Sequence, residues 1–322
     1  MSNLITPIFS LKGKKVYVAG HNGMVGSAII RRLKKIDCDY LTVNSSDLDL
    51  MNSNNVDSWF QENKPDVVFM AAAKVGGIHA NNFYPVEFLY ENIAIQNSLI
   101  KNSYKHKVKK LMFLGSSCIY PVNAEQPLKE SSLLTGSLEK TNESYALAKI
   151  TGIKLCQAYR KQYKADFISV MPTNLYGSGD NFHPENSHVV AALISKFYDA
   201  VLYKKKTITL WGTGSPLREF LDVDDLADGL VFIMENYSDA EAINIGTGKE
   251  ISIIEFANLI KKISGWKGNF IFDSSHPDGM YRKTLDLSKL NKLGWNANTK
   301  LEDGLRKAYN WYKDNYDNVR KK

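Results

Sequence analysis

The sequence predicts an α/β fold of the Rossmann type, in which a doubly wound parallel sheet carries a smaller α/β lobe. Three observations predict it. Short apolar strands alternate with helical patterns over the first half of the chain, a glycine-rich loop follows the first strand, and the pattern loosens after Pro172. Apolar strands between helices are typical of a sheet covered on both faces, with right-handed crossovers between parallel strands.

The elements follow in order along the chain. In the first half we expect strands at 15–19, 40–43, 67–72, 111–115 and 167–171, and helices at 24–35, 56–63, 85–101 and 143–163. Beyond Pro172 we expect strands at 208–211 and 242–245, and helices at 189–203, 223–235, 253–264 and 301–312. This order predicts a dinucleotide-binding Rossmann domain at 1–172 with a return segment near 222–248. It leaves 173–221 and 249–322 for a substrate-binding lobe.

Bulk properties exclude several classes of protein. The chain has 322 residues, 44% hydrophobic and 23% charged, which is ordinary for a globular protein. No apolar run approaches the roughly 20 residues that span a bilayer, and residues 1–11 lack a signal-peptide pattern. We therefore expect a cytoplasmic protein with no membrane partner. Three scattered cysteines are too few for a disulfide framework or a metal site, so no metal is expected.

The formal net charge is +7. A basic balance can indicate nucleic acid or anionic small ligands. The lysines are spread along the chain and no nucleic-acid reader motif accompanies them. We expect no nucleic-acid partner, and an anionic small ligand explains any functional part of the charge better.

A glycine-rich loop, AGHNGMVG, joins the first strand to the first helix. Glycine permits a tight turn and close backbone approach to a pyrophosphate, which the helix N-terminus attracts through its amides and dipole. A turn that only joins strand to helix is the alternative. The spacing Gly-x-x-Gly-x-x-Gly resembles that of extended short-chain dehydrogenases/reductases. The residues expected to bind the cofactor here are Gly20, Asn22, Gly23, Met24, Val25 and Gly26.

The end of the second strand is expected to choose between NAD and NADP. An acid at its tip would select the ribose 2′-hydroxyl and an arginine the 2′-phosphate. The residues that follow Val43 offer neither directly, and the expected contacts are Ser45, Ser46, Asp47 and Leu48, next to Asn44. Hydroxyls and amides would bind a phosphate only modestly without a cation from elsewhere, so the residues alone leave the choice open.

Three residues predict reductase chemistry. Tyr145 and Lys149 are four apart on one face of a helix. A neighbouring ammonium favours the phenolate and is expected to lower the tyrosine pKa. Ser116 follows a strand and can donate to a substrate carbonyl. A surface Tyr and Lys on an amphipathic helix are the alternative, but the order of glycine loop, serine and Tyr-x-x-x-Lys favours a catalytic triad.

Longer stretches carry a closer resemblance. They are AGHNGMVGS (19–27), AAAKVGGIH (71–79), LGSSCIYP (114–121), MPTNLYG (171–177), DNFHPENSHV (180–189) and WGTGSPLREFLDVDD (211–225). Over nearly the whole chain the sequence resembles the GDP-L-fucose synthase family, the 3,5-epimerase-4-reductases of GDP-4-keto-6-deoxy-mannose.

The resemblance implies NADP(H), a GDP-4-keto-6-deoxy sugar and a homodimer. It implies further cofactor contacts at Ala72, Leu114, Gly115, Ser117, Pro172, Asn174 and Leu175, and substrate contacts at Lys196, Trp211, Arg218 and Asp278. It assigns epimerisation to Cys118 and His188, which would otherwise be interpreted as a small buried hydrophobe and a loop histidine. His183 could serve structure or the sugar. One departure is that relatives often carry arginine beside the adenosine ribose, where this chain has 44–46 (NSS).

Other functions remain open at this point. One is a C4 reductase without epimerisation, acting on a related sugar such as GDP-6-deoxy-4-keto-heptose in surface polysaccharide synthesis. Another is a non-catalytic nucleotide sensor, since a fold does not fix function. A third is a UDP-sugar 4-epimerase with tightly held NAD. The intact triad argues against the sensor, and the Ser-Ser-Cys and Asn-Ser-His strings argue against the UDP-sugar enzyme.

Overall fold

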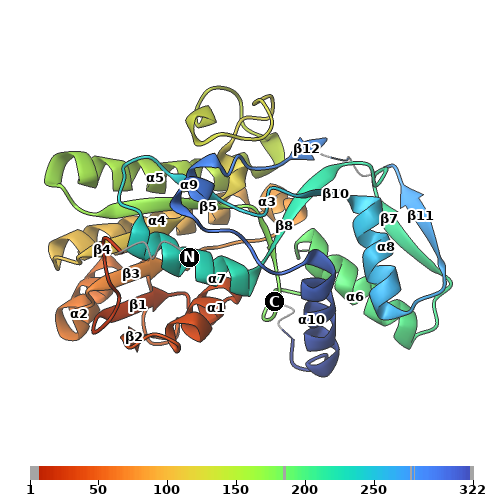
Figure 1. Ribbon diagram of the computed structural model, residues 1–322, viewed down its shortest axis with the longest axis horizontal. Coiled ribbons are helices and arrows are strands. Elements are labelled where there is room, and N and C mark those ends of the chain that lie inside the picture. Colours follow the sequence, from red (N-terminus) through yellow and green to blue (C-terminus); the bar gives the residue numbers. More distant parts are fainter. Residues whose placement is uncertain (1–6, 184–185, 276–277, 279, 320–322) are drawn as a thin grey trace, which may run out of the picture.

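The computed structural model describes residues 7–183, 186–275, 278 and 280–319. Two lobes lie side by side, with the larger sheet and its helices at the left of Figure 1 and the smaller lobe at the right. The described residues exclude Pro184 and Glu185 of the stretch DNFHPENSHV (180–189). They also exclude Pro277 and Gly279 on either side of Asp278.

The larger lobe is built on a six-stranded parallel sheet of order β2-β1-β3-β4-β5-β9. Its strands are β1 (Lys15–Ala19), β2 (Asp39–Leu41), β3 (Val67–Met70), β4 (Lys110–Leu114), β5 (Phe167–Pro172) and β9 (Ile243–Ile245). The chain builds outward from β1 in one direction and then in the other, so the switch in strand order lies between β1 and β3. Ligands bind such sheets beyond the carboxyl ends of the strands at that point.

Alternate residues of each strand enter two separate cores. Val16 and Val18 pack on one face with helices α1 (Met24–Leu33) and α7 (Val223–Asn236). Tyr17 and Ala19 pack on the other face, which is covered by α2 (Ser53–Asn63), α4 (Pro85–Lys105) and α5 (Glu143–Tyr163). The strands are therefore buried on both faces, as a parallel sheet requires. The predicted Rossmann-type fold is confirmed.

The smaller lobe combines short strands with three longer helices. A sheet of order β10-β8-β12 also pairs β8 with β6, and β11 pairs with β7. The strands are β6 (Asn174–Tyr176), β7 (Thr207–Trp211), β8 (Leu217–Asp222), β10 (Glu250–Ser252), β11 (Asn269–Asp273) and β12 (Arg282–Lys283). The helices are α6 (Val189–Leu202), α8 (Ile253–Ser264) and α10 (Leu301–Asp314). They enclose a third core around Phe197, Phe220 and Phe256.

The shorter helices connect these parts. They are α3 (Ile78–Phe83), α9 (Ser288–Leu293) and the 3₁₀ turns η1 (Ser117–Ile119), η2 (Glu130–Ser132) and η3 (Lys140–Asn142). No helix among the described residues is both long and apolar enough to cross a membrane.

Late residues return to the first sheet. Helix α7 covers the α1 face and β9 extends the sheet beyond β5. Leu290 and Trp295 also enter the core on that face, although they follow β9 by some 45 residues or more in sequence. The core under α1 is therefore completed by residues that follow β5 in the sequence, from α7 to Trp295.

Most predicted elements lie where the sequence places them, and three have the predicted bounds: β1, α5 and α8. The predicted end of the second strand, at Val43, is wrong. Strand β2 stops at Leu41, because its pairing with β1 ends there, at Tyr17. The first helix stops at Leu33 rather than Lys35, because the chain turns there and Ile36 N donates to Leu33 O at 2.8 Å.

Candidate active site

The glycine loop is a backbone cradle. Gly20 has φ +84°, and a Cβ built on it would lie 2.6 Å from the Ala72 backbone nitrogen. A Cβ on Gly26 would lie 2.1 Å from the Gly20 carbonyl oxygen. Side chains are therefore excluded where a pyrophosphate must approach the backbone, so the loop fits a dinucleotide.

Helix α1 leaves its N-terminus to a ligand. Its N-cap is Gly23, which offers no side-chain hydrogen bond, and its first turn contains no acid. The first amides of a helix have no partner within the helix, and the dipole there favours an anion. Met24, Val25 and Gly26 provide the amides of this turn, as the sequence predicts.

A small polar network follows β2. Asn22 Nδ2 donates to Asn44 Oδ1 at 3.0 Å, and Asn44 Nδ2 donates to Asp47 Oδ2 at 3.2 Å. Ser46 Oγ donates to the other Asp47 oxygen at 2.9 Å, and Leu48 is buried behind this turn. Amides and hydroxyls from the glycine loop and from the end of β2 therefore meet, next to an acid.

The strand ends carry the other expected cofactor contacts. Gly115 N donates to Val170 O at 2.8 Å, which ties the end of β4 to β5. Asn174 Nδ2 donates to Glu219 O at 2.8 Å and so orients the strand β6 that contains Leu175. The remaining expected residues, Ala72, Leu114, Ser117 and Pro172, lie at or just beyond the carboxyl ends of β3, β4 and β5. This is the edge at which the doubly wound fold binds ligands.

Ser116, Tyr145 and Lys149 lie together at this edge. The Ser116 hydroxyl hydrogen-bonds the Tyr145 side chain and also accepts from Cys118 N at 3.3 Å. Lys149 is 5% exposed, and its Nζ donates to Leu114 O at 2.8 Å and lies 5.6 Å from the Tyr145 ring centroid. Phe88 of α4 packs edge-on against Tyr145. The end of β4 thus meets the face of α5 that carries both Tyr145 and Lys149, as their i, i+4 spacing predicts.

The direction of the Tyr145 pKa differs from the prediction. Burial raises this pKa well above its usual range and the charge of Cys118 adds to the rise, while the Ser116 hydrogen bond opposes it. Burial also lowers the pKa of Lys149 to about 8. The predicted lowering by the ammonium is wrong here, because Lys149 points to a backbone carbonyl and desolvation of the phenol dominates. Tyr145 is consequently a neutral phenol at pH 7, and a phenol is a proton donor.

Cys118 and His188 reach this region from different elements. Cys118 is half-buried in η1, and Lys283 Nζ of β12 donates to its sulfur at 3.6 Å. His188 is the N-cap of α6 and is exposed to water at the residue level. Nearby protein atoms desolvate the imidazole and lower the His188 pKa, and the charge of Lys283 lowers it further. Lys283 therefore acts on both residues; no periodicity or motif marks it in the sequence.

Gly76 and Gly77, just before α3, lie against the His188 loop, and a Cβ on Gly76 would lie 3.4 Å from Asn186 O. Gly77 N donates to Asn186 O at 2.9 Å, and a Cβ on Gly77 would lie 2.5 Å from Ser187 O. His183 has a structural contact in the same loop, because its Nδ1 accepts from Asn186 N at 3.1 Å. The loop that positions His188 is thus held by backbone contacts and by His183.

The four expected substrate residues form two pairs in the smaller lobe. Lys196 Nζ lies 5.1 Å from the Trp211 ring centroid, and Trp211 is 50% exposed. Arg218 Nη2 donates to Asp278 O at 3.3 Å, and burial lowers the Arg218 pKa while Asp278 opposes that shift. Asp278 also accepts from Thr213 N at 2.7 Å. The lobe therefore presents two cations and a half-exposed aromatic ring. Within the described residues no cluster of His, Cys, Asp and Glu could hold a metal ion.

Comparisons with known proteins show the family and the fold of the chain. The sequence pattern of the NAD dependent epimerase/dehydratase family matches residues 16–246. GDP-L-fucose synthase 1 of Arabidopsis thaliana is 54% identical over 308 residues, which cover 95% of each chain. A GDP-L-fucose synthetase of Naegleria fowleri, solved with NADP, has a TM-score of 0.91 at 31% identity and covers 98% of this chain and 99% of its own. A GDP-6-OMe-4-keto-L-xylo-heptose reductase of C. jejuni has a TM-score of 0.89 at 36% identity, over 95% and 99% of the two chains.

Proposed function

Because the chain belongs to the NAD dependent epimerase/dehydratase family, and within it to the GDP-L-fucose synthases, we propose that it reduces C4 of a GDP-4-keto-6-deoxy sugar. The cofactor is NADP(H), and the reaction includes inversion at C3 and C5, as in GDP-L-fucose synthesis. The observation that carries the proposal is the meeting of Ser116, Tyr145 and Lys149 at the sheet edge, next to Cys118.

Reduction uses the triad. NADPH, when bound, supplies the hydride that reaches C4. The Ser116 hydroxyl hydrogen-bonds the Tyr145 side chain, so both can approach one ketone oxygen. Because burial keeps Tyr145 protonated, the phenol gives its proton to the oxygen as negative charge develops there. Lys149 then stabilises the phenolate that remains.

Inversion uses Cys118 and His188. The C4 ketone acidifies the protons at C3 and C5, and each inversion needs a base on one face of the sugar and an acid on the other. These two side chains belong to different lobes, Cys118 after β4 and His188 at the start of α6. Ser116 and Tyr145 would stabilise the enolate oxygen at C4.

The smaller lobe binds the GDP moiety. Lys196 and Arg218 suit a diphosphate, and the half-exposed Trp211 is an aromatic of the kind that stacks on a base or a sugar. Asp278 orders the Thr213 turn and has oxygens available to sugar or ribose hydroxyls. In the larger lobe, Asn22, Ser45 and Ser46 would receive the adenosine ribose and its 2′-phosphate.

A C4 reductase of a GDP-keto-heptose is the second candidate. The fold favours it nearly as well, since the heptose reductase has a TM-score of 0.89. The sequence favours the fucose synthases, at 54% identity against 36%. We therefore prefer the epimerase-reductase to a heptose reductase that lacks epimerisation.

We also propose a cytoplasmic homodimer that supplies a GDP-sugar for surface polysaccharide. The cysteines Cys38, Cys118 and Cys156 are free thiols, as suits a reducing compartment. Helices α4 and α5 carry exposed Tyr90 and Tyr163, which a second copy would cover. Light scattering that gives the mass of one chain would contradict the dimer.

The test of function supplies GDP-4-keto-6-deoxy-mannose and NADPH in deuterated water. We expect NADPH oxidation together with deuterium at C3 and C5 of the product. NADPH oxidation without deuterium at those carbons would establish the reductase alone and favour the second candidate. Absence of NADPH oxidation with either a hexose or a heptose ketone would contradict both.

A further inference from the structure

Lys283 interacts with both groups proposed for epimerisation. Its Nζ donates to Cys118 Sγ at 3.6 Å, and its charge also acts on His188. Nothing in the reduction uses it, since Ser116, Tyr145 and Lys149 already supply the proton donor and its partners. An ammonium beside a thiol stabilises the anionic sulfur and orients it.

The segment that carries Lys283 is fixed by backbone and buried groups. Lys283 pairs in register with Arg218 of β8. Two residues later, Leu285 N donates at 2.9 Å to Glu219, a carboxyl group that is fully buried. Leu128 N donates to Thr284 O at 2.8 Å on the other side. The lysine therefore extends from an anchored strand rather than from a loose loop.

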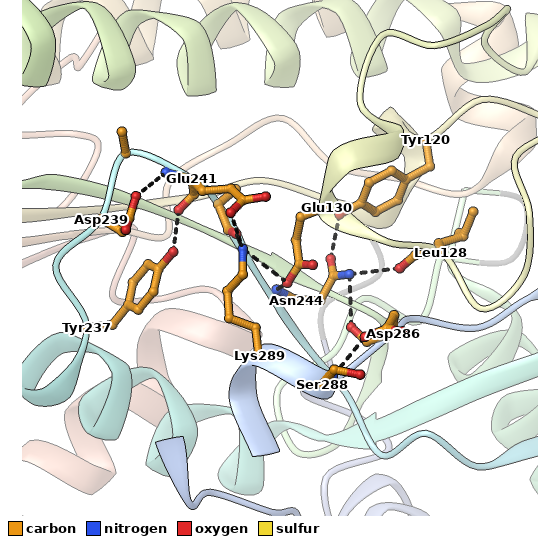
Figure 2. Close-up of polar contacts among 12 residues, drawn as sticks. Tyr120, Leu128, Glu130, Tyr237, Asp239, Glu241, Asn244, Asp286, Ser288 and Lys289 are labelled. Carbon is orange, nitrogen blue, oxygen red and sulfur yellow. Dashed lines mark hydrogen bonds and ion pairs between the residues drawn. The ribbon is translucent and has the colours of Figure 1, made fainter. Parts of the chain in front are cut away.

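The segment that carries Cys118 is anchored to the same place. Figure 2 shows Asn244 of β9 at the centre of this anchor. Tyr120, two residues after Cys118, donates its hydroxyl proton to Asn244 Oδ1 at 2.5 Å. Asn244 Nδ2 donates to Leu128 O at 2.9 Å and to Asp286 O at 3.1 Å. One buried amide thus fixes the Cys118 segment relative to the segment after Lys283.

Other charges near the pair are already engaged. Lys149 and Tyr145 of α5 interact electrostatically with Cys118, but the Lys149 ammonium donates to Leu114 O. Near the His188 loop, His79 of α3 contacts Asn186 Oδ1 at 3.4 Å and stacks on Phe83. Of Lys149, His79 and Lys283, it is Lys283 of β12 that donates to the Cys118 sulfur.

We propose that Lys283 is a positioning residue for epimerisation, which orients the Cys118 sulfur through its ammonium and acts on both members of the Cys118–His188 pair. The proposal rests on the function given above. Lys283 keeps its own protons throughout. The proton that leaves C3 or C5 goes to one member of the pair, and the other member gives a proton to the opposite face of the same carbon.

A first test needs no sugar and therefore stands apart from the proposed function. The rate of Cys118 alkylation by iodoacetamide at pH 7 is followed by mass spectrometry in wild type, Lys283→Met and Lys283→Arg. We expect about a tenfold slower reaction in Lys283→Met, because the thiolate is the nucleophile, and at most a threefold change in Lys283→Arg, which keeps a charged donor. Cys38 in the same molecule is the internal reference. Equal Cys118 rates in wild type and Lys283→Met, measured against Cys38, overturn the proposal.

A second test measures deuterium exchange at C3 and C5 against pH. We expect at least a tenfold loss of exchange in Lys283→Met with little change in KM, and recovery in Lys283→Arg. The His188 pKa, lowered by Lys283, should rise without that charge, so the limb of the profile due to His188 moves to higher pH. Lys249→Met, at an exposed lysine of the β9–β10 turn, is the control for folding. Undiminished exchange in Lys283→Met contradicts the proposal, whereas absence of exchange in wild type contradicts the epimerase function itself.

Discussion

At the edge of the six-stranded sheet the lysine of the triad is buried and held by backbone, whereas the smaller lobe offers an exposed aromatic ring and half-buried cations. Lys149 is 5% exposed and bound to a strand carbonyl, but Trp211 is 50% exposed and covered on one side by Lys196. At Gly20 and Gly26 the glycine cradle has no room for a side chain. Arg218 donates to the Leu217 carbonyl of its own strand and to the Asp278 and Tyr281 carbonyls of the loop before β12.

This difference predicts that the two regions affect different kinetic constants, kcat at the sheet edge and KM for the GDP-sugar in the smaller lobe. Buried groups with displaced pKa values act on charge that develops only in the transition state, so their loss should lower kcat. The cations and the aromatic of the smaller lobe are proposed to bind a part of the substrate that does not react, so their loss should raise KM. Substitutions in the two regions can break or sharpen this distinction.

Tyr145→Phe should have the largest effect. It removes the proton donor while leaving the ring on Phe88, so kcat for C4 reduction should fall about a thousandfold with KM little changed. Steady-state NADPH oxidation measures it. Tyr203→Phe, at the exposed end of α6, is the control and should retain full activity. A Tyr145→Phe enzyme with more than a tenth of wild-type kcat would remove Tyr145 from the mechanism.

Gly26→Ala should rank second, and it tests the backbone cradle. The new methyl would lie 2.1 Å from the Gly20 carbonyl oxygen, so the turn must shift. We expect a loss of about 3 kcal/mol in the free energy of unfolding, together with weaker NADPH binding by fluorescence titration. Gly23→Ala is the matched control for stability, because its methyl would meet that oxygen at 3.4 Å, an ordinary contact. Equal melting temperatures for both variants would show that the cradle yields easily.

Arg218→Lys should have the smallest effect of the three. Lysine keeps the charge but not the fork that reaches carbonyls on two sides, so KM for the GDP-sugar should rise about tenfold, or 1.4 kcal/mol. The reducing step should be unaffected in single-turnover experiments. Arg306→Lys, at an exposed position of α10, is the control. A fall in kcat with KM unchanged would place Arg218 with the chemical groups and erase the distinction.

Sequence reasoning reached the first region better than the second. Strands such as β1, buried on both faces, are uninterrupted apolar runs, and α5 has a complete helical pattern, so both were predictable. The Tyr145–Lys149 spacing likewise places both residues on one helix face. The direction of the tyrosine pKa was not predictable, because it depends on how many atoms surround the phenol and on where the ammonium points.

The smaller lobe shows why other features are missed. Strands β6, β10 and β12 have three residues or fewer, too short to display an alternating pattern. Lys283 gains its position through Glu219 and Asn244, which are 64 and 39 positions away in the chain. Only the folded structure brings them together. The pairing of Arg218 with Asp278 depends on tertiary contacts of the same kind.

The late return of α7 and β9 to the first sheet has a consequence for biogenesis. When a ribosome has released residues up to Pro172, five strands and the helices of the other face exist, but the face under α1 still lacks α7 and Trp295. A nascent chain at that stage leaves the α7-facing side of Val16, Val18 and Phe69 to water or to a chaperone. Completion of the dinucleotide-binding half therefore waits for translation of nearly the whole chain. A fragment that ends at the apparent domain boundary would be expected to aggregate rather than to bind its cofactor.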